Sequence, residues 1–219
     1  MQKIKHPTPD SLSVVVLDLQ YMPPLPYFLI LMRARQVILD IHEHYVKQSY
    51  RNRCRILTPN GTLDLVVPLS KPRQHIPMEN IRIDNNQNWA RIHWKAIQSA
   101  YGKSPWFLHY ASPIHDLIME KNIYLKDLNL KILKYFLEVL GIHTDPVFTE
   151  KYDKTLHENC TDLRSAIHPK KTDTGLTFYQ PVPYGQNFGV NFVSSLSIID
   201  LVFNEGPESR EIIFKSYFA

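Results

Sequence analysis

The chain has 219 residues, 44% of them hydrophobic and 21% charged, with a formal net charge of +4 at pH 7. This composition excludes a disordered chain and is typical of a globular protein, and the modest positive charge does not predict a nucleic-acid partner. Its two cysteines, Cys54 and Cys160, lie far apart, so neither a disulfide framework nor a cysteine zinc site is predicted.

The sequence predicts a cytoplasmic protein with reduced thiols. The first residues, MQKIKHPTPDSL, lack the apolar core of a signal peptide, and apolar runs such as FLILM are too short to form an integral membrane segment. We expect a single domain over residues 1–219, with a flexible N-terminus at residues 1–12. The sequence leaves the oligomeric state open.

Two buried strands open the expected domain. VVVLDL (14–19) and QVILD (36–40) are short continuous apolar runs, which are typical of strands buried on both faces. The segment between them, PPLPYFLILMRAR (23–35), predicts a short helix with Pro26 in its first turn. Strand, helix and strand predict a parallel pair with a right-handed crossover.

Polar side chains follow both of these strands. Asp18 and Gln20 come at the end of the first strand, and Asp40, His42 and Glu43 come at the end of the second. The carboxyl ends of parallel strands meet at one edge of a sheet, and ligands bind at that edge in open α/β sheets. We therefore expect these side chains to lie together in a ligand site.

A β-hairpin is predicted over residues 51–67, because Asn60-Gly61 is a strong signal for a two-residue turn. With that pair at the turn, the predicted cross-strand pairs on the apolar face are Thr58–Leu63, Ile56–Leu65 and Cys54–Val67. Arg51, Arg53 and Arg55 then point together from the other face, with Asp64 diagonal to Arg55.

This face predicts an anion-binding stripe. Lys47 joins it if the strand extends backwards, and Tyr45, Gln48 and Asn52 interleave with the cations and supply groups that orient a ligand. The alternative is a solvated outer face with weak salt bridges, each contributing roughly 0 to 1 kcal/mol.

The middle of the chain is predicted to be helical. A helical stripe runs over 89–101, with Asn88 as its cap and Gly102 as its stop, and a further stripe ends at Gly141. SLSIIDLVFNEGP predicts a buried helix that stops at Gly206. The expected fold class is α/β: one mixed domain with a small sheet, a short βαβ start, a hairpin and a helical middle region.

The histidines offer several chemistries. His42-Glu43-His44 is a weak metal motif, because adjacent residues of an extended segment point to opposite faces, and no metal or cofactor is expected. His93 is either a satisfied core histidine or a general base on a rigid helix. His168, next to Lys170 and Lys171, is either an exposed loop residue or part of an anion clamp. The chain has no GxSxG, Walker or dinucleotide motif.

Several motifs together resemble the WbqC-like family of bacterial proteins. They are QYMPPLPYF, HEHYVKQSYRNRC, NWARIHWKAIQSAYGKSPWF and NFVSSLSIIDLVFNEGP, and the resemblance runs from about Leu17 to about Pro207. DLRSAIHPK resembles a subset from the Bacteroidetes. His44 departs from the family pattern, which weakens the metal interpretation further. The matching motif positions are Gln20, Pro23, Tyr27, Phe28, His42, Glu43, Tyr45, Lys47, Gln48, Arg51, Asn52, Arg53, His93, Trp94, Asn204 and Gly206.

The resemblance implies a link to O-antigen and other surface-polysaccharide gene sets, and it brings no established mechanism. One hypothesis is a transferase that passes an acyl or aminoacyl group to an activated amino-sugar, a phosphate-bearing substrate. Another is a non-catalytic protein that binds a sugar nucleotide or an anion. A third is a metal-dependent hydrolase, which needs a further ligand beside His42 and Glu43. The candidate catalytic residues are His42, Glu43 and His93, and the candidate substrate-binding residues are Gln20, Tyr45, Lys47, Gln48, Arg51, Asn52, Arg53 and His168.

Overall fold

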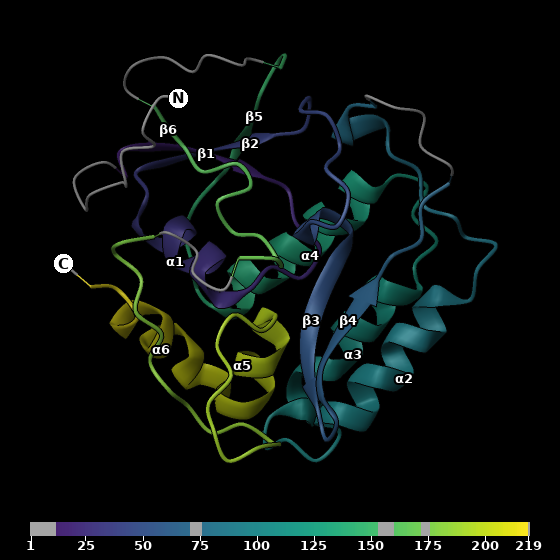
Figure 1. Ribbon diagram of the computed structural model, residues 1–219, viewed down its shortest axis with the longest axis vertical. Helices are drawn as coiled ribbons and strands as arrows, with labels where there is room; N and C mark the ends of the chain where they lie inside the picture. Colours follow the sequence, from purple (N-terminus) through teal and green to yellow (C-terminus); the bar gives the residue numbers. More distant parts are fainter. Residues whose placement is uncertain (1–11, 71–75, 153–159, 172–175, 219) are drawn as a thin grey trace.

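The structure, a computed structural model, describes residues 12–70, 76–152, 160–171 and 176–218 (Figure 1). The expected flexible N-terminus lies outside these ranges except for Leu12, which is buried. The strands are β1 Val14–Asp18, β2 Gln36–Asp40, β3 Arg53–Thr58, β4 Gly61–Val66, β5 Val147–Phe148 and β6 Cys160–Asp162. The α-helices are α1 Leu25–Arg33, α2 Trp89–Tyr101, α3 Phe107–Met119, α4 Leu125–Val139, α5 Ile198–Glu205 and α6 Ser209–Lys215. Short 3-10 helices are η2 Tyr50–Asn52, η3 Met78–Asn80 and η4 Gly206–Glu208.

A four-stranded parallel sheet has the strand order β5-β2-β1-β6. Consecutive residues of β1, which point to opposite faces of the sheet, are buried, as its continuous hydrophobicity predicts. Helix α1 joins β1 to β2, and the register sets Asp18 beside Asp40. The predicted parallel start of the domain, and with it the mixed α/β fold class, is confirmed.

The strand order creates a switch point between β1 and β6. From β1 the chain moves to β2 and then to β5 in one direction, whereas β6 lies on the opposite side of β1. Helices α1 and α4 precede β2 and β5, and they contact each other through Phe28 and Phe136, whose ring centroids are 6.1 Å apart. In α/β sheets of this kind, the crevice at the carboxyl ends next to the switch point is the usual ligand site.

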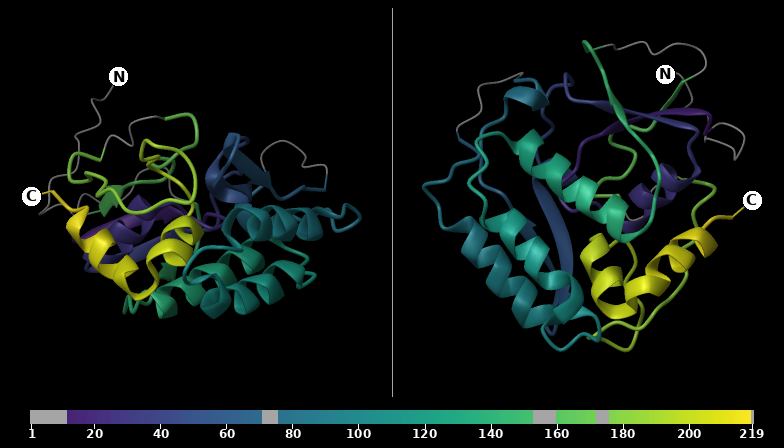
Figure 2. Two further views of the ribbon diagram at one scale, coloured as in Figure 1. Left: turned by 90° about the horizontal axis from the view of Figure 1, so that it is seen from below. Right: turned by 180° about the vertical axis from the view of Figure 1, so that it is seen from behind.

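A long insertion, residues 41–146, separates the neighbouring strands β2 and β5. It contains the β3–β4 hairpin and helices α2 to α4, and both α2 and α5 pack against β3. Figure 1 shows the hairpin running through the middle of the molecule, and Figure 2 shows α4 crossing the middle in the view from behind. Helix α2 spans 89–101 and is followed by Gly102, as expected, although the Asn88 side chain makes no capping hydrogen bond.

The hairpin register differs from the prediction by two residues. The observed pairs are Thr58–Gly61, Ile56–Leu63, Cys54–Leu65, Arg55–Asp64 and Arg53–Val66. The turn is centred on Pro59-Asn60 because the proline ring fixes a negative φ and suits the first central position, while Gly61 follows with φ +98. Since the shift is even, Cys54 and Ile56 still face the core.

One hydrophobic core joins these parts. Its buried residues run from Leu12 to Ile213 and come from the parallel sheet, the hairpin and the helices. In the part of the chain that the structure describes, no helix combines the length and apolarity needed to cross a bilayer.

Candidate functional site

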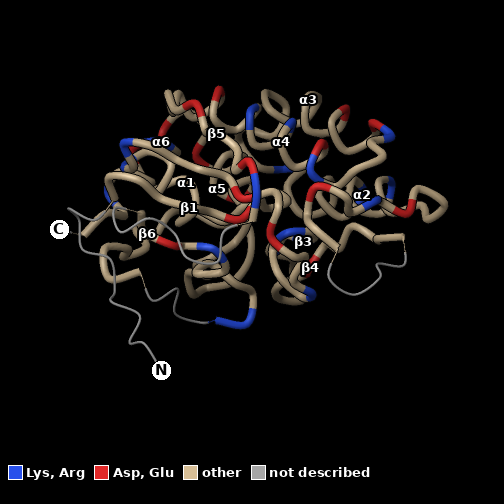
Figure 3. The backbone as a smooth tube through the Cα atoms, turned by 90° about the horizontal axis from the view of Figure 1, so that it is seen from above, with Lys and Arg blue, Asp and Glu red and all other residues tan. Residues whose placement is uncertain are grey.

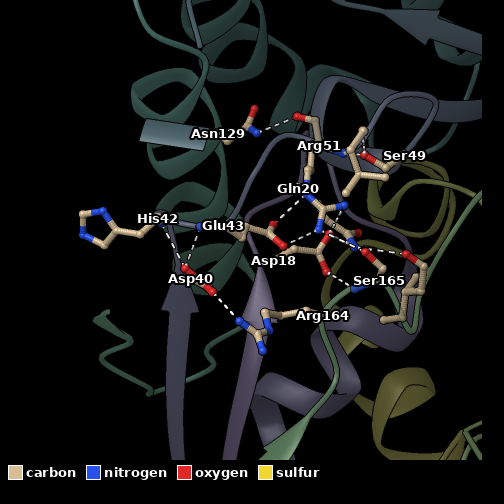
Figure 4. A network of polar contacts seen from close by, with 12 residues as sticks. Asp18, Gln20, Asp40, His42, Glu43, Ser49, Arg51, Asn129, Arg164 and Ser165 are labelled. Carbon is tan, nitrogen blue, oxygen red and sulfur yellow. Dashed lines mark hydrogen bonds and ion pairs between the residues drawn. The ribbon is translucent and has the colours of Figure 1, made fainter. Parts of the chain in front are cut away.

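Acidic side chains gather at the carboxyl ends of β1 and β2. Asp18 ends β1, Asp40 ends β2, and Glu43 follows three residues later (Figure 4). Asp40 Oδ1 accepts hydrogen bonds from the main-chain N–H groups of His42 and Glu43, at 2.9 and 3.0 Å, which fixes the turn after β2. Gln20 is buried beside them, and its Nε2 donates to Asp18 Oδ2 at 3.1 Å. Asp18, Gln20, Asp40 and Glu43 therefore meet at one edge of the sheet, as the parallel pairing predicts.

Arg51 lies between two of these carboxylates. Its Nε and Nη2 donate to Glu43 Oε1 and Oε2 at 2.6 and 2.7 Å, and its Nη1 is 3.2 Å from Asp18 Oδ2. Ser49 caps the short helix η2, and Asn129 of α4 donates to the main-chain oxygen of Arg51 at 2.8 Å. The side chain is 0% exposed, so Arg51 is a buried counterion.

Burial sets the protonation of this pair. It raises the pKa of Glu43 to about 7, although the hydrogen bonds from Arg51 oppose that shift. For Arg51 burial lowers the pKa, but Asp18 and Glu43 outweigh it, so that the pKa is raised and the guanidinium stays charged. Glu43 therefore exchanges a proton near neutral pH while remaining held in a fixed orientation.

The segment after β6 completes this cluster. Arg164 Nη1 donates to Asp40 Oδ2 at 2.6 Å, and its Nη2 donates to Asp162 Oδ2 at 2.7 Å. Ser165 N–H donates to Asp18 Oδ1 at 2.9 Å, and its Oγ accepts from Arg51 Nη2 at 3.0 Å. We define the edge cluster as Asp18, Gln20, Asp40, Glu43, Arg51, Arg164 and Ser165. In Figure 3, acidic and basic segments adjoin between the labels of β1 and β3.

His168 lies on the same loop, close to the edge cluster. The pKa of His168 is lowered mainly by burial, and the positive charges of Lys171 and Arg51 lower it further. Lys171 Nζ donates to the main-chain oxygen of Ser165 at 3.0 Å, which holds this cationic loop against the site. His168 is half-buried, whereas Lys170 and Lys171 are exposed, and we call residues 168–171 the cationic loop.

His42 lies beside the edge cluster and faces away from it. Its Nδ1 is 3.3 Å from Glu79 Oε1, and its ring points away from Arg51 in Figure 4. His44 stacks on Tyr152 with ring centroids 5.7 Å apart. Within residues 12–70, 76–152, 160–171 and 176–218, no three His, Cys, Asp or Glu side chains gather in a group able to hold a metal ion.

The predicted single stripe of arginines is wrong in its geometry. Arg51 belongs to η2 and is enclosed between carboxylates, because the chain bends there before β3 begins. Arg53 and Arg55 instead share Asp64, at 3.7 and 2.8 Å, and Asp64 is directly opposite Arg55 rather than diagonal to it. The cations of this segment therefore divide between an interior ion network and a partly exposed, neutralised hairpin face.

The remaining predicted ligand residues are dispersed. Asn52 is buried, and its Nδ2 donates to the Val67 main-chain oxygen at 2.8 Å, so it joins the hairpin strands. Tyr45 is half-buried, while Lys47 and Gln48 are exposed, and Gln48 has φ +58. These residues stand outside the hydrogen-bonded edge cluster.

His93 faces inward and borders a cavity of about 260 Å³. Its Nδ1 lies 3.0 Å from the Tyr21 hydroxyl, and its ring also bonds to the main chain of Val66. Burial lowers its pKa to about 4, so the ring is neutral at physiological pH. Its contacts therefore join α2 to β4 and to the segment after β1.

Sequence comparison places the edge cluster in a family context. The profile of the WbqC-like protein family matches residues 20–172 and 167–212. The chain belongs to the WbqC-like protein family. The matched ranges contain Glu43, Arg51 and Ser165, so most of the edge cluster lies within the WbqC-like region.

A curated relative can be compared over nearly the whole chain. The Mycobacterium tuberculosis protein Rv1507c, described as uncharacterized, is 26% identical over 230 residues, which cover 92% of this chain and 97% of that protein. No solved structure gives a significant match.

The sequence signals missed two members of the edge cluster, Arg164 and Ser165. They follow β6, whose CTD sequence is too short and polar to be recognised as a strand. The DLRSAIHPK motif was the one available signal, since it places arginine, serine, histidine and lysine within a few residues.

Proposed function

We propose that this WbqC-like protein is a transferase that passes an acyl or aminoacyl group to an activated amino-sugar during bacterial surface-polysaccharide biosynthesis. Glu43 is the general base in this proposal. The observation that carries it is a buried glutamate that Arg51 holds by two hydrogen bonds at the carboxyl end of a parallel sheet, where burial raises the glutamate's pKa to about 7. A base with a pKa near the working pH combines the ionised state with a useful affinity for the proton.

The chemistry follows from the position of Glu43. An amine or hydroxyl of the acceptor approaches the carboxylate, gives up its proton to Glu43, and attacks the carbonyl carbon of the donor. The bond between that carbon and the donor's leaving group then breaks, and Glu43 returns the proton to the leaving group. Arg51 keeps the carboxylate oriented through two parallel hydrogen bonds, so that little reorganisation is needed when the proton moves.

The cationic loop supplies the anion contact in this proposal. Lys170 and Lys171 are exposed, and Lys171 donates a hydrogen bond directly to the main-chain oxygen of Ser165. Lysine ammonium groups bind phosphate as point charges. Arg51 is left out of this role because Asp18 and Glu43 already neutralise it.

The second candidate is a sugar-nucleotide-binding protein without catalysis. It is favoured by the complete enclosure of Arg51 and by the low exposure of Glu43, which is 6%. In that case the edge cluster holds the fold and the cationic loop alone recognises the anion.

A ligand screen followed by turnover assays tests the proposal. Sugar nucleotides, coenzyme A derivatives and phosphates are screened by thermal shift, since a ligand that binds the folded state raises Tm. The compounds that bind are then combined as donor and acceptor, and product is measured for the wild type, Glu43→Gln and Glu138→Gln, an exposed glutamate of α4.

Loss of a general base lowers turnover roughly 10²- to 10⁴-fold, so Glu43→Gln should bind the ligand yet turn over at least about 100-fold more slowly. Glu138→Gln should match the wild type. Undiminished turnover in Glu43→Gln would remove Glu43 from the mechanism. Ligand binding without any product from the wild type would favour the binding protein.

A further inference from the structure

Ser165 has a strained backbone at the edge of the proposed site. It is half-buried and has φ +57, in a turn closed by the hydrogen bond from Ala166 N–H to Leu163 O at 3.0 Å. Turns that need a positive φ at this third position favour glycine. A side chain retained in such a conformation at the carboxyl end of a parallel strand indicates a functional constraint.

Every polar group of Ser165 is held by a charged side chain of the site. Its N–H donates to Asp18, its main-chain oxygen accepts from Lys171, and its Oγ accepts from Arg51. Because Ser165 Oγ accepts a hydrogen bond from Arg51, the hydroxyl hydrogen of Ser165 can be donated to another group. These contacts fix the position of the hydroxyl oxygen.

The Ser165 hydroxyl and the Glu43 carboxylate accept hydrogen bonds from the same guanidinium nitrogen. Arg51 Nη2 is 2.7 Å from Glu43 Oε2 and 3.0 Å from Ser165 Oγ. The two N–H bonds of this nitrogen diverge, so the two oxygens lie on either side of it and a proton passes between them through one bridging water. Glu43 and Arg51 are buried while Ser165 is half-buried, so Ser165 is the most accessible residue of the three.

We propose that Ser165 is a covalent nucleophile that carries the acyl group between donor and acceptor. This inference rests on the proposed transferase function and specifies that the transfer takes place in two steps. A serine hydroxyl is a weak nucleophile and needs an adjacent base, and a neighbouring cation stabilises the oxygen anion that forms. Glu43 meets the first need. Arg51, although its charge is shared with Asp18 and Glu43, meets the second through its hydrogen bond to Oγ.

In the first step, Ser165 Oγ attacks the carbonyl carbon of an acyl donor, such as a thioester, and its proton goes to Glu43. The bond between that carbon and the leaving group breaks, and Glu43 returns the proton to the departing group. In the second step, the acceptor amine attacks the acyl-serine ester and gives its proton to Glu43. The ester C–O bond breaks, and Oγ recovers the proton.

A serine-reactive alkyl fluorophosphonate tests this without knowledge of the natural donor. Ser165 Oγ should form a bond to phosphorus and expel fluoride, which intact-mass measurement and peptide mapping detect. The adduct should be absent in Ser165→Ala, and the labelling rate should fall at least about tenfold in Glu43→Gln, because removal of a general base costs roughly 10² or more in favourable cases. Ser195→Ala is the matched control, since Ser195 is also half-buried with φ +60.

Ser165→Gly provides a second variant that suits the positive φ, in case Ser165→Ala fails to fold. No adduct on wild-type Ser165, or an unchanged adduct in the Ser165 variants, overturns the inference. If transfer depends on Glu43 while Ser165 stays unlabelled, transfer is direct: the transferase stands and the covalent step fails. If Ser165 is labelled but no acceptor takes the acyl group, the nucleophile stands and the transferase fails.

Discussion

Replacing Arg51 with methionine should strongly destabilise the fold. Methionine retains much of the length and apolar stem, so the main loss is the charge that Asp18 and Glu43 share. Arg51 makes two hydrogen bonds to Glu43, one to Ser165 and an ion pair with Asp18, and it is 0% exposed. Removing one partner of a buried ion pair costs about 3–5 kcal/mol, because the other charge is left without compensation.

Arg53→Met is the matched control. Arg53 has a 19% exposed side chain and its ion-pair contact with Asp64 is 3.7 Å long, while Arg55 continues to neutralise that carboxylate. Pairs of this kind contribute about 1 kcal/mol or less. The free energy of unfolding, measured by urea titration at pH 7, should therefore fall several times more in Arg51→Met than in Arg53→Met.

A double variant, Arg51→Met with Asp18→Asn, separates charge from packing. It removes the Asp18 carboxylate that Arg51→Met leaves without its counterion, so it should be roughly 0.5–3 kcal/mol more stable than Arg51→Met alone. Equal losses in Arg51→Met and Arg53→Met, or no recovery in the double variant, would refute the assignment of Arg51 as a buried counterion.

Two pH effects follow from the same structure. Burial raises the pKa of Glu43 from 4.5 to about 7, so between these pH values the folded state holds a proton that the unfolded chain releases. The stability that this proton contributes is lost as the pH rises through that range. In urea titrations, the unfolding free energy of the wild type minus that of Glu43→Gln should decline from pH 4.5 to 7, and a rise would contradict the prediction. His93 has the opposite sign, because burial lowers its pKa from 6.5 to about 4 and its contribution to stability is lost as the pH falls through that range. An NMR titration should place the His93 midpoint near pH 4, and a midpoint near 6.5 would show that the ring is not enclosed.

The opening of the domain was predictable because its signals are local. Continuous apolar runs with one intervening helix specify β1, α1 and β2, and parallel pairing then requires Asp18 and Asp40 to meet. The hairpin was also predictable, but its register was not, since the Asn60-Gly61 signal competes with Pro59, whose ring decides the turn.

The site itself depends on contacts that no short sequence pattern carries. Arg51, Arg53 and Arg55 alternate as strand residues do, yet the bend at η2 sends only Arg51 into the interior. Ser165 lies at the site because β6, which precedes it, pairs with β1 from a distant part of the chain. The roles of these arginines therefore depend on tertiary contacts with residues distant in the sequence.

The insertion between β2 and β5 has a consequence for how the protein folds. Asp40 and Arg164 are 124 residues apart in the chain, and Asp18 and Ser165 are 147 residues apart. Contacts at such separations form late, because the intervening chain must first become ordered. During synthesis on the ribosome, Asp18 and Asp40 emerge long before these partners, and two carboxylates without partners oppose burial of the strand ends that carry them. We therefore expect the sheet edge to close and the site to be completed in the same late step. A nascent chain that lacks the residues beyond 160 should have neither a closed sheet edge nor a complete site.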